Sequence, residues 1–226
     1  MKLQYTIIAF LLFFFTNCSK QDNYAAPDAE ITGQLVNADT QSPFQTEQPN
    51  GVKIRILDTK YGANVSPIDI WAKADGSFET TQLFKGNYKV IPIEGAFFSA
   101  DTALVTTDRT ADISFTVTPF LNINMDAAKS GSSIIVNYSL SRSRVGDKII
   151  EAKSLLSAYP SVSNSINEMS VQHDLSGEDD EAVLVNNYSD TLKNITTGNS
   201  CYIRVAAKTA NANGKYNYSK VVKIDF

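Results

Sequence analysis

The chain has 226 residues, and its 20 lysine and arginine residues against 24 aspartate and glutamate residues give a net charge of −4. Because the basic residues form no cluster, the sequence argues against nucleic-acid binding, which needs grouped cations to neutralise phosphates. Apolar residues make up 43% of the chain, enough for packed cores and atypical of disorder. The length fits one large or two small domains.

The first residues have the pattern of an export signal. Lys2 supplies a positive charge, and residues 7–15 form an unbroken apolar run. That run is shorter than the roughly 20 residues that cross a bilayer and fits the ~7–15 residues of a signal-peptide core. Cys18 follows at the position of a lipoprotein cleavage site, although Asn17 is larger than the residue such sites usually carry. We predict a signal peptide at residues 1–17 and a lipid on Cys18; an ordinary signal peptide cleaved elsewhere is the alternative.

The chain has two cysteines, Cys18 and Cys201. If Cys18 carries a lipid, Cys201 has no disulfide partner. The alternation around Cys201 is typical of a strand and predicts that Cys201 points inward while Tyr202 and Arg204 point outward. We therefore interpret Cys201 as a small buried core residue and not as a reactive thiol.

Residues 18–28 are polar and are predicted to form a lipidated tether, and after them the apolar pattern has a period of two. In residues 51–57, valine and isoleucine alternate with lysine and arginine, as in a strand with one buried face. Residues 68–73 alternate in the same way, and the Asp-Gly pair at 75–76 predicts a tight turn. Later strands are expected from residue 78 onward, at 88–91 and at 110–118, before Pro119. Residues 29–119 are therefore predicted to form one β-sandwich.

Residues 120–226 contain a second series of alternating segments, separated by turn residues at spacings typical of β-sandwiches. The expected strands lie at residues 121–125, 134–140, 149–156, 182–187, 201–208 and 221–226. The segment 149–159 is open to two interpretations, because its apolar residues could also face one side of a short helix. The sequence thus predicts an all-β fold, with two β-sandwich domains in series after a lipoprotein signal peptide.

The first domain carries short motifs in a fixed order. G-x-L begins at Gly33, G-V-x-I at Gly51, D-G-x-F at Asp75 and L-x-x-G-x-Y-x-V at Leu83. This order resembles the carboxypeptidase-regulatory-like or transthyretin-like β-sandwich. The resemblance implies glycines at turns and a Phe and a Tyr packed between two small sheets, and it carries no activity of its own.

The second domain resembles the closing strands of fibronectin type III and immunoglobulin-like domains. The resemblance rests on Cys-Tyr-Ile-Arg-Val at residues 201–205, after a turn glycine, and on Tyr-Ser-Lys-Val-Val at 218–222. In those families a tyrosine ties the strand corner through its hydroxyl. Alignment on Arg204 and Val205 places Cys201 at that tyrosine position, so the chain departs from the family there.

The whole mature chain, residues 18–226, resembles an uncharacterised family of Bacteroidetes outer-membrane lipoproteins found beside starch-utilisation-type glycan uptake systems. The match rests on Gln-Thr-Glu-Gln-Pro at residues 45–49 and Ile-Pro-Ile-Glu-Gly-Ala-Phe-Phe at 91–98. It implies a lipid-anchored outer-membrane protein, displayed at the cell surface, that works near glycan capture and import. It brings no catalytic residues to carry over.

The sequence offers few groups for catalysis. His173 is the only histidine; a Ser–His–Asp arrangement through it stays open, but nothing resembles a nucleophile elbow. One histidine and one inward cysteine make a zinc site implausible. The acidic run with Asp179, Asp180 and Glu181 offers oxygen ligands for calcium, although such runs are usually solvated turns. We expect no enzyme activity and no cofactor.

A sugar-binding module would show exposed aromatic rings beside hydrogen-bonding groups. Trp71 is the best candidate, because the alternation points it away from the buried face, with Asp69 and Lys73 beside it. Tyr61 lies in a neighbouring loop. Other aromatic residues in or next to loops are Phe97, Phe98, Tyr159, Tyr216 and Tyr218. For each of them, packing within a sandwich or a loop is the alternative interpretation.

Two threonines, Thr102 and Thr191, lie in Asp-Thr-apolar sequences. These resemble the acceptor pattern of Bacteroidetes O-glycosylation. Both are candidate modification sites.

The function that the sequence favours is that of a non-enzymatic, lipid-anchored accessory protein of the outer membrane. It would bind polysaccharide or assist a neighbouring uptake complex. The main alternative is a structural or protein-interaction module of the cell envelope that contacts no sugar, and a hydrolase is a more remote one. Aromatic residues lining one exposed face would favour glycan binding, whereas an apolar patch would favour protein docking.

Overall fold

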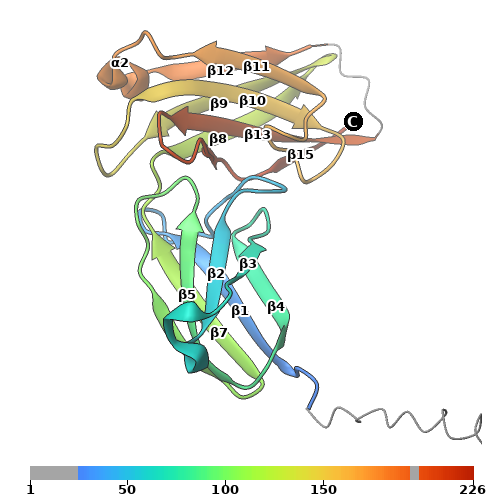
Figure 1. The fold of residues 1–226 in the computed structure, drawn as a ribbon. Helices are drawn as coiled ribbons and strands as arrows, with labels where there is room; N and C mark the ends of the chain where they lie inside the picture. Colours follow the sequence, from blue (N-terminus) through green and yellow to red (C-terminus); the bar gives the residue numbers. More distant parts are fainter. Residues whose placement is uncertain (1–24, 194–198) are drawn as a thin grey trace, which may run out of the picture.

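The structure is a computed structural model that describes residues 25–193 and 199–226, apart from the side chains at positions 61, 63 and 64. Two β-sandwiches follow each other along the chain (Figure 1). The expected all-β fold of two sandwiches in series is confirmed. The predicted signal peptide and Cys18 lie outside the described residues. Within the described ranges, no helix has the length and apolar character that crossing a membrane requires.

The first sandwich contains strands β1 to β7 and a short 3-10 helix, η2. Their bounds are β1 Ala29–Asn37, β2 Lys53–Asp58, η2 Thr59–Asn64, β3 Ile68–Trp71, β4 Ser77–Leu83, β5 Gly86–Glu94, β6 Ala103–Thr107 and β7 Thr110–Val117. One sheet has the order β4-β1-β7 and the other β3-β2-β5-β6. β1 and β7 pair in parallel, and the other neighbours are antiparallel.

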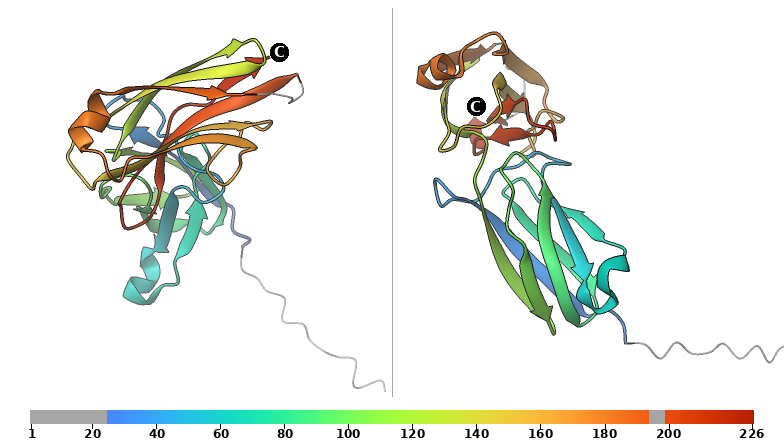
Figure 2. Two further views of the ribbon diagram at one scale, coloured as in Figure 1. Left: turned by 90° about the horizontal axis from the view of Figure 1, so that it is seen from above. Right: turned by 60° about the vertical axis from the view of Figure 1, so that its left-hand side comes forward.

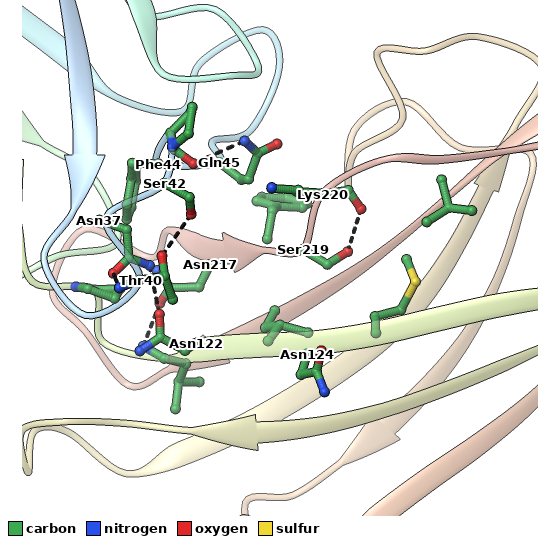
Figure 3. A pocket seen from close by; sticks show the side chains of 17 residues that line it. Asn37, Thr40, Ser42, Phe44, Gln45, Asn122, Asn124, Asn217, Ser219 and Lys220 are labelled. Atoms are coloured by element: carbon green, nitrogen blue, oxygen red, sulfur yellow. Dashed lines mark hydrogen bonds between the residues drawn. The ribbon is translucent and has the colours of Figure 1, made fainter.

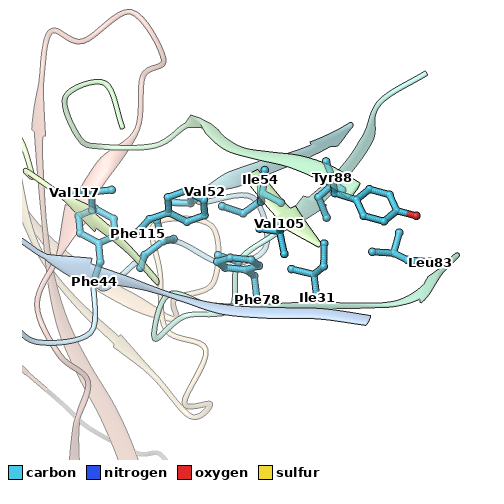
Figure 4. Packing of buried hydrophobic residues seen from close by; sticks show 14 of the residues in the cluster. Ile31, Phe44, Val52, Ile54, Phe78, Leu83, Tyr88, Val105, Phe115 and Val117 are labelled. Carbon is cyan, nitrogen blue, oxygen red and sulfur yellow. The ribbon is translucent and has the colours of Figure 1, made fainter. Parts of the chain in front are cut away.

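Alternating apolar side chains from both sheets fill this sandwich (Figure 4). Phe78 and Tyr88, the aromatic residues of the recurring motifs, are both buried, as the family resemblance implied. A Cβ on Gly33 would lie 2.3 Å from the Phe78 ring, so the ring packs directly against the backbone of β1. The Tyr88 hydroxyl donates a hydrogen bond of 2.8 Å to the carbonyl of Phe84, which ties the turn between β4 and β5. Each such large apolar side chain contributes about 1.5–3 kcal/mol through burial.

The turn predicted at residues 75–76 is present. Gly76 has φ +79°, a conformation that favours glycine. Asp75 Oδ1 accepts hydrogen bonds from the backbone N–H and the hydroxyl of Ser77, at 3.0 and 2.7 Å. The hydroxyl bond is the main reason why the pKa of Asp75 is lowered. The turn is therefore held by its own side chains.

The second sandwich contains strands β8 to β15 and one short helix, α2. Their bounds are β8 Asn122–Ser130, β9 Ser133–Ser141, β10 Ile149–Ser157, β11 Met169–Asp174, α2 Asp180–Val185, β12 Asn187–Leu192, β13 Ser200–Thr209, β14 Tyr216–Tyr218 and β15 Val222–Asp225. One sheet has the order β12-β9-β8 and the other β11-β10-β13-β14, with β15 also paired to β13. Apolar residues from both sheets form its core.

Two segments of this sandwich test what the sequence predicted at residues 149–159 and 182–187. The segment left open at 149–159 is a strand, β10, which pairs with β11 and β13. The strand expected at 182–187 is wrong, because α2 occupies its first part and β12 starts at Asn187. Asp179 caps this helix by accepting a hydrogen bond of 2.9 Å from the Glu181 N–H, and only Val183 of the helix is buried. Because only one residue of α2 points into the core, the sequence shows no repeat of apolar residues every three to four positions that would predict a helix.

The sandwiches are stacked end to end, and two views agree on this arrangement (Figures 1 and 2). The chain enters β1 at the end of the first sandwich that lies farthest from the second. The link between them is short, since β7 ends at Val117 and β8 starts at Asn122. The first sandwich therefore lies between the start of β1 and the second sandwich.

Candidate functional site at the domain junction

The two sandwiches meet around Arg204 of β13, which is 0% exposed. Its guanidinium donates hydrogen bonds to the backbone carbonyls of Thr46 (2.9 Å) and Ala74 (3.3 Å) in the first sandwich and of Ser219 (2.9 Å) in the second. It also lies 4.4 Å from the ring centroid of Tyr218. Burial lowers the pKa of Arg204 to about 10, so the side chain stays charged at neutral pH. Arg204 does point out of its own sandwich, as predicted, but the first sandwich covers that face.

Further polar contacts cross the junction. The Asn217 amide accepts a hydrogen bond of 3.0 Å from the Leu121 N–H and donates one of 2.7 Å to the carbonyl of Ala96. The Ser163 hydroxyl donates to the carbonyl of Gln48 at 2.7 Å. Because these bonds use backbone groups of both domains, they hold the sandwiches in one orientation.

A cleft of about 420 Å³ opens at this junction (Figure 3). We call it the junction cleft. Its polar lining includes Asn37, Thr40, Ser42, Asn122, Asn124 and Lys220, and its apolar lining includes Pro43, Phe44, Leu121 and Met125. Apolar walls with a few convergent amides and hydroxyls are the usual composition of a small-molecule site.

Hydrogen bonds orient one side of the junction cleft. Asn37 Nδ2 donates to Asn122 Oδ1 at 2.7 Å, and the hydroxyls of Thr40 and Ser42 lie 2.7 Å apart. The side chain of Asn124 is exposed and makes no hydrogen bond within the described part of the chain. Its amide is therefore available to a ligand.

A second hollow of about 450 Å³ lies between residues 47–50 of the first sandwich and residues 208–216 of the second. We call it the lysine groove, after Lys208 and Lys215 in its lining. The Lys215 Nζ donates a hydrogen bond of 2.6 Å to the carbonyl of Asn50, across the junction. Tyr216 also lines the groove, and Glu47 is its one acidic residue. The sequence pattern did not single out these lysines.

Trp71 lies beside the lysine groove. Its side chain is 37% exposed, and Lys215 Nζ of the second sandwich lies 5.0 Å from its ring centroid. Lys53 Nζ, from the neighbouring strand β2, lies 4.8 Å from the same ring. Trp71 thus stands at the domain junction with two ammonium groups over its ring, an arrangement that stabilises the cations and leaves part of the indole open to solvent.

The other residues proposed to act with Trp71 have partners of their own. Asp69 accepts two hydrogen bonds from Arg55, at 2.8 and 2.7 Å, and these are the main reason why the pKa of Asp69 is lowered. Lys73 forms an exposed ion pair of 3.1 Å with Glu79. The side chain of Tyr61 lies outside the described part of the structure. Trp71 is therefore joined at the junction by lysines of β2 and of the second sandwich.

The candidate O-glycosylation sites differ in their surroundings. Thr102 and the preceding Asp101 are both exposed in the loop before β6. Thr191 is exposed on β12, but the preceding Asp190 is buried. Modification of either threonine stays a prediction.

The histidine lies in a small polar cluster between the sheets of the second sandwich. His173 Nε2 is 2.7 Å from Asp190 Oδ1, and the Ser154 hydroxyl donates to Asp190 Oδ2 at 2.6 Å. The carboxylate stands between serine and histidine, so the histidine does not contact the hydroxyl as a base must. Ser154 is also fully buried. The cluster links the two sheets and does not form the Ser–His–Asp arrangement that the sequence left open.

Two of the three calcium candidates have structural roles. Asp179 caps α2, and Asp180 pairs with Arg142 at 3.0 Å and accepts the N–H of Ile149 at 3.0 Å. Glu181 is exposed in the first turn of the helix. Within the described residues, no group of three or more His, Cys, Asp or Glu side chains is arranged to hold a metal ion. The three carboxylates do not converge on one point.

Family models place this architecture among known proteins. Residues 29–118 match the model described as "Protein of unknown function (DUF3823) N-terminal domain", and residues 121–223 match "Domain of unknown function (DUF3823_C)". The chain belongs to the DUF3823 family. A comparison with curated proteins finds none that matches.

Solved structures of the family share the fold. A DUF3823 protein from Bacteroides uniformis has a TM-score of 0.76 at 19% identity, covering 88% of this chain and 100% of its own. One from Parabacteroides merdae has a TM-score of 0.75 at 19% identity, covering 89% and 100%. Another solved structure, from Bacteroides uniformis, is named a "putative carbohydrate binding protein"; its TM-score is 0.73 at 17% identity, covering 88% of this chain and 100% of its own. At these identities the likeness establishes the fold alone.

Proposed function

We propose that this chain is a non-enzymatic glycan-binding accessory lipoprotein and that it binds saccharide at the domain junction. The observation that carries the proposal is the junction cleft, where amides and hydroxyls stand over apolar walls built by both sandwiches. Pyranose rings present apolar C–H faces and a ring of hydroxyls, which suit such a lining. The carbohydrate-binding name of one structural relative points the same way.

A lipid on Cys18 would fit this role. The chain enters the first sandwich at its far end, so the junction stands a whole sandwich away from the tether (Figure 1). A binding site held out from a membrane can reach polysaccharide outside it. Anchoring in the outer membrane, display at the cell surface and work beside a glycan uptake complex belong to the same proposal.

The test is a polysaccharide array and affinity gel electrophoresis on the chain from residue 19 onward, which keeps both sandwiches. We expect binding to at least one polysaccharide, weakened about tenfold by Asn124→Ala in the junction cleft or by Trp71→Ala beside the lysine groove, the loss of one good contact each. Phe84→Ala is the control, since Phe84 is exposed in the turn between β4 and β5 and lines neither hollow at the junction. Binding to no polysaccharide would contradict the proposal, and co-purification of an envelope protein instead would favour a protein-interaction role.

A further inference from the structure

We propose that the lysine groove binds the anionic group of an acidic glycan, a uronate carboxylate or a sulfate ester, so that the protein selects charged over neutral saccharides. The inference rests on the proposed glycan-binding function and adds the charge class of the ligand. The inference is argued from the carboxylates and aromatic rings that surround Lys208 and Lys215.

The two lysines of the groove lack acidic partners. Among the described residues, no carboxylate lies within ion-pair distance of Lys208 or Lys215. By contrast, nearby Lys153 pairs with Glu151 at 2.5 Å. Glu47, the one acidic residue of the lining, accepts a hydrogen bond of 3.1 Å from the Ser165 hydroxyl. Glu151 lies opposite Lys208 in the β10–β13 register and accepts a hydrogen bond of 3.1 Å from the Tyr216 hydroxyl. Three lysines, Lys153, Lys208 and Lys215, thus stand against two carboxylates, Glu47 and Glu151, in a chain whose net charge is −4.

Lysines are also crowded around one aromatic ring. Lys208 Nζ lies 5.2 Å and Lys153 Nζ 5.3 Å from the ring centroid of Tyr216. Burial, and after it the charge of Lys208, lower the pKa of Lys153. Ammonium groups that repel each other at a partly enclosed site are stabilised by an anion that binds between or beside them. Lys153 already has Glu151 as a counter-charge, so a carboxylate or sulfate in the groove would supply the one that Lys208 lacks.

Lys215 connects the groove to Trp71. Its ammonium reaches the carbonyl of Asn50 and the indole of Trp71 from the same position, and so stands between the ring and the groove. A sugar that packs on the exposed part of the indole would bring its substituents next to this cation. An acidic sugar fits that position better than a neutral one, because ammonium groups bind anions by charge-assisted hydrogen bonds.

The experiment compares polymers that differ in charge alone. One pair is polygalacturonate and its methyl-esterified form, and the other is dextran sulfate and dextran. Affinities are measured by isothermal titration calorimetry at low and high salt, for the native chain and for the double variant Lys208→Gln/Lys215→Gln. The control is Lys85→Gln, which removes one positive charge in the turn between β4 and β5, where Lys85 makes exposed ion pairs of 3.7 Å with Asp28 and Asp108. Circular dichroism verifies that each variant is folded.

We expect the acidic member of a pair to bind at least about tenfold more tightly than its neutral partner at low salt, and this preference to fall in high salt. The double variant should lose the preference and Lys85→Gln should keep it. A preference confined to galacturonate identifies carboxylate as the ligand group, and one confined to dextran sulfate identifies sulfate. Equal affinity for both members of each pair, or a preference that the double variant retains, would overturn the inference while leaving glycan binding intact. Absence of binding to these and to all array polysaccharides would instead remove the proposed function itself.

Discussion

The guanidinium of Arg204 in the second sandwich donates a hydrogen bond to the carbonyl of Thr46 in the first, although the two residues are 158 positions apart in the chain. This bond belongs to a fork of donors that reaches backbone carbonyls on both sides of the junction. Backbone carbonyls cannot neutralise the charge, so the arginine depends on bonds from both domains to offset its desolvation. We infer that Arg204 couples the two sandwiches energetically.

Replacing Arg204 should separate the unfolding of the domains. Arg204→Met keeps much of the apolar stem but leaves several buried carbonyls without donors, at a cost of about 1–3 kcal/mol each where no water replaces them. We expect urea denaturation to change from one transition to two. Arg204→Lys should rescue little, since lysine lacks the planar fork of donors. Arg109→Met, in the exposed turn between β6 and β7, is the matched control and should unfold like the native chain. A single, unshifted transition for Arg204→Met would disprove the coupling.

Gly33 should tolerate no side chain. A Cβ there would lie 2.3 Å from the Phe78 ring and 2.6 Å from the carbonyl oxygen of Ile113. We expect Gly33→Ala to destabilise the chain by about 1–3 kcal/mol or more, as overpacking does, in thermal or urea denaturation. Gly177→Ala is the control, because its Cβ would meet nothing within 4 Å. If both alanine variants were equally stable, the close packing of Phe78 on β1 would be refuted.

Two buried tyrosines should respond oppositely to loss of the hydroxyl. The Tyr138 hydroxyl is buried without a hydrogen-bond partner in the described residues, and burial raises its pKa. Tyr138→Phe should therefore leave stability unchanged or increase it by up to about 1 kcal/mol. Tyr88→Phe removes the bond to the carbonyl of Phe84 and should cost about 1 kcal/mol. The free energy of unfolding of each variant checks the pair, and a clear loss in Tyr138→Phe would point to a partner such as a bound water.

The Asp-x-Ser turns should contribute stability that depends on pH. Asp75 accepts two hydrogen bonds from Ser77, and Asp174 accepts two from Ser176 in the same geometry. In both, the serine hydroxyl is the main cause of a lowered carboxyl pKa. A carboxyl whose pKa is lowered by folding stabilises the native state above its unfolded pKa of about 3.9, and this contribution is lost as the pH falls through the folded pKa.

Ser77→Ala and Ser176→Ala should accordingly be less stable than the native chain at pH 7 and approach it in stability near pH 2. Urea denaturation at several pH values measures the difference. Ser132→Ala, in the exposed turn between β8 and β9, should show no such trend. A gap that stayed constant between pH 7 and pH 2 would assign the effect to something other than the carboxylates.

The elements that the sequence predicts well are those with one buried face. In β2 every second residue enters the core, so the period of two is clear. In β13 Cys201, Ile203 and Val205 enter the core in the same way, which gives the inward position of Cys201, although the opposite face is also buried at Arg204 and Ala206. Hydrophobic periodicity does not predict the helix α2, because the cap at Asp179 sets its start and only Val183 is buried. Short helices fixed by caps leave little periodic signal.

The candidate site could be predicted only in part for a related reason. The alternation predicts that Trp71 leaves the core, and it does lie partly exposed on the outer face. That Lys215 meets it depends on how the second sandwich docks, which no local pattern encodes. Arg204 is the same case: an outward position in a strand says nothing about what covers it. A site formed by two domains can be recognised only when the relative position of the domains is known.

The unpaired thiol of Cys201 has a practical consequence. It is free, fully enclosed between the sheets of the second sandwich, and its pKa is raised by burial. In a chain that starts at residue 19 it is the sole cysteine, so a thiol-reactive dye can label a molecule only after that sandwich opens. The rate at which Cys201 is labelled therefore reports how often the second sandwich opens. No engineered cysteine is needed for this measurement.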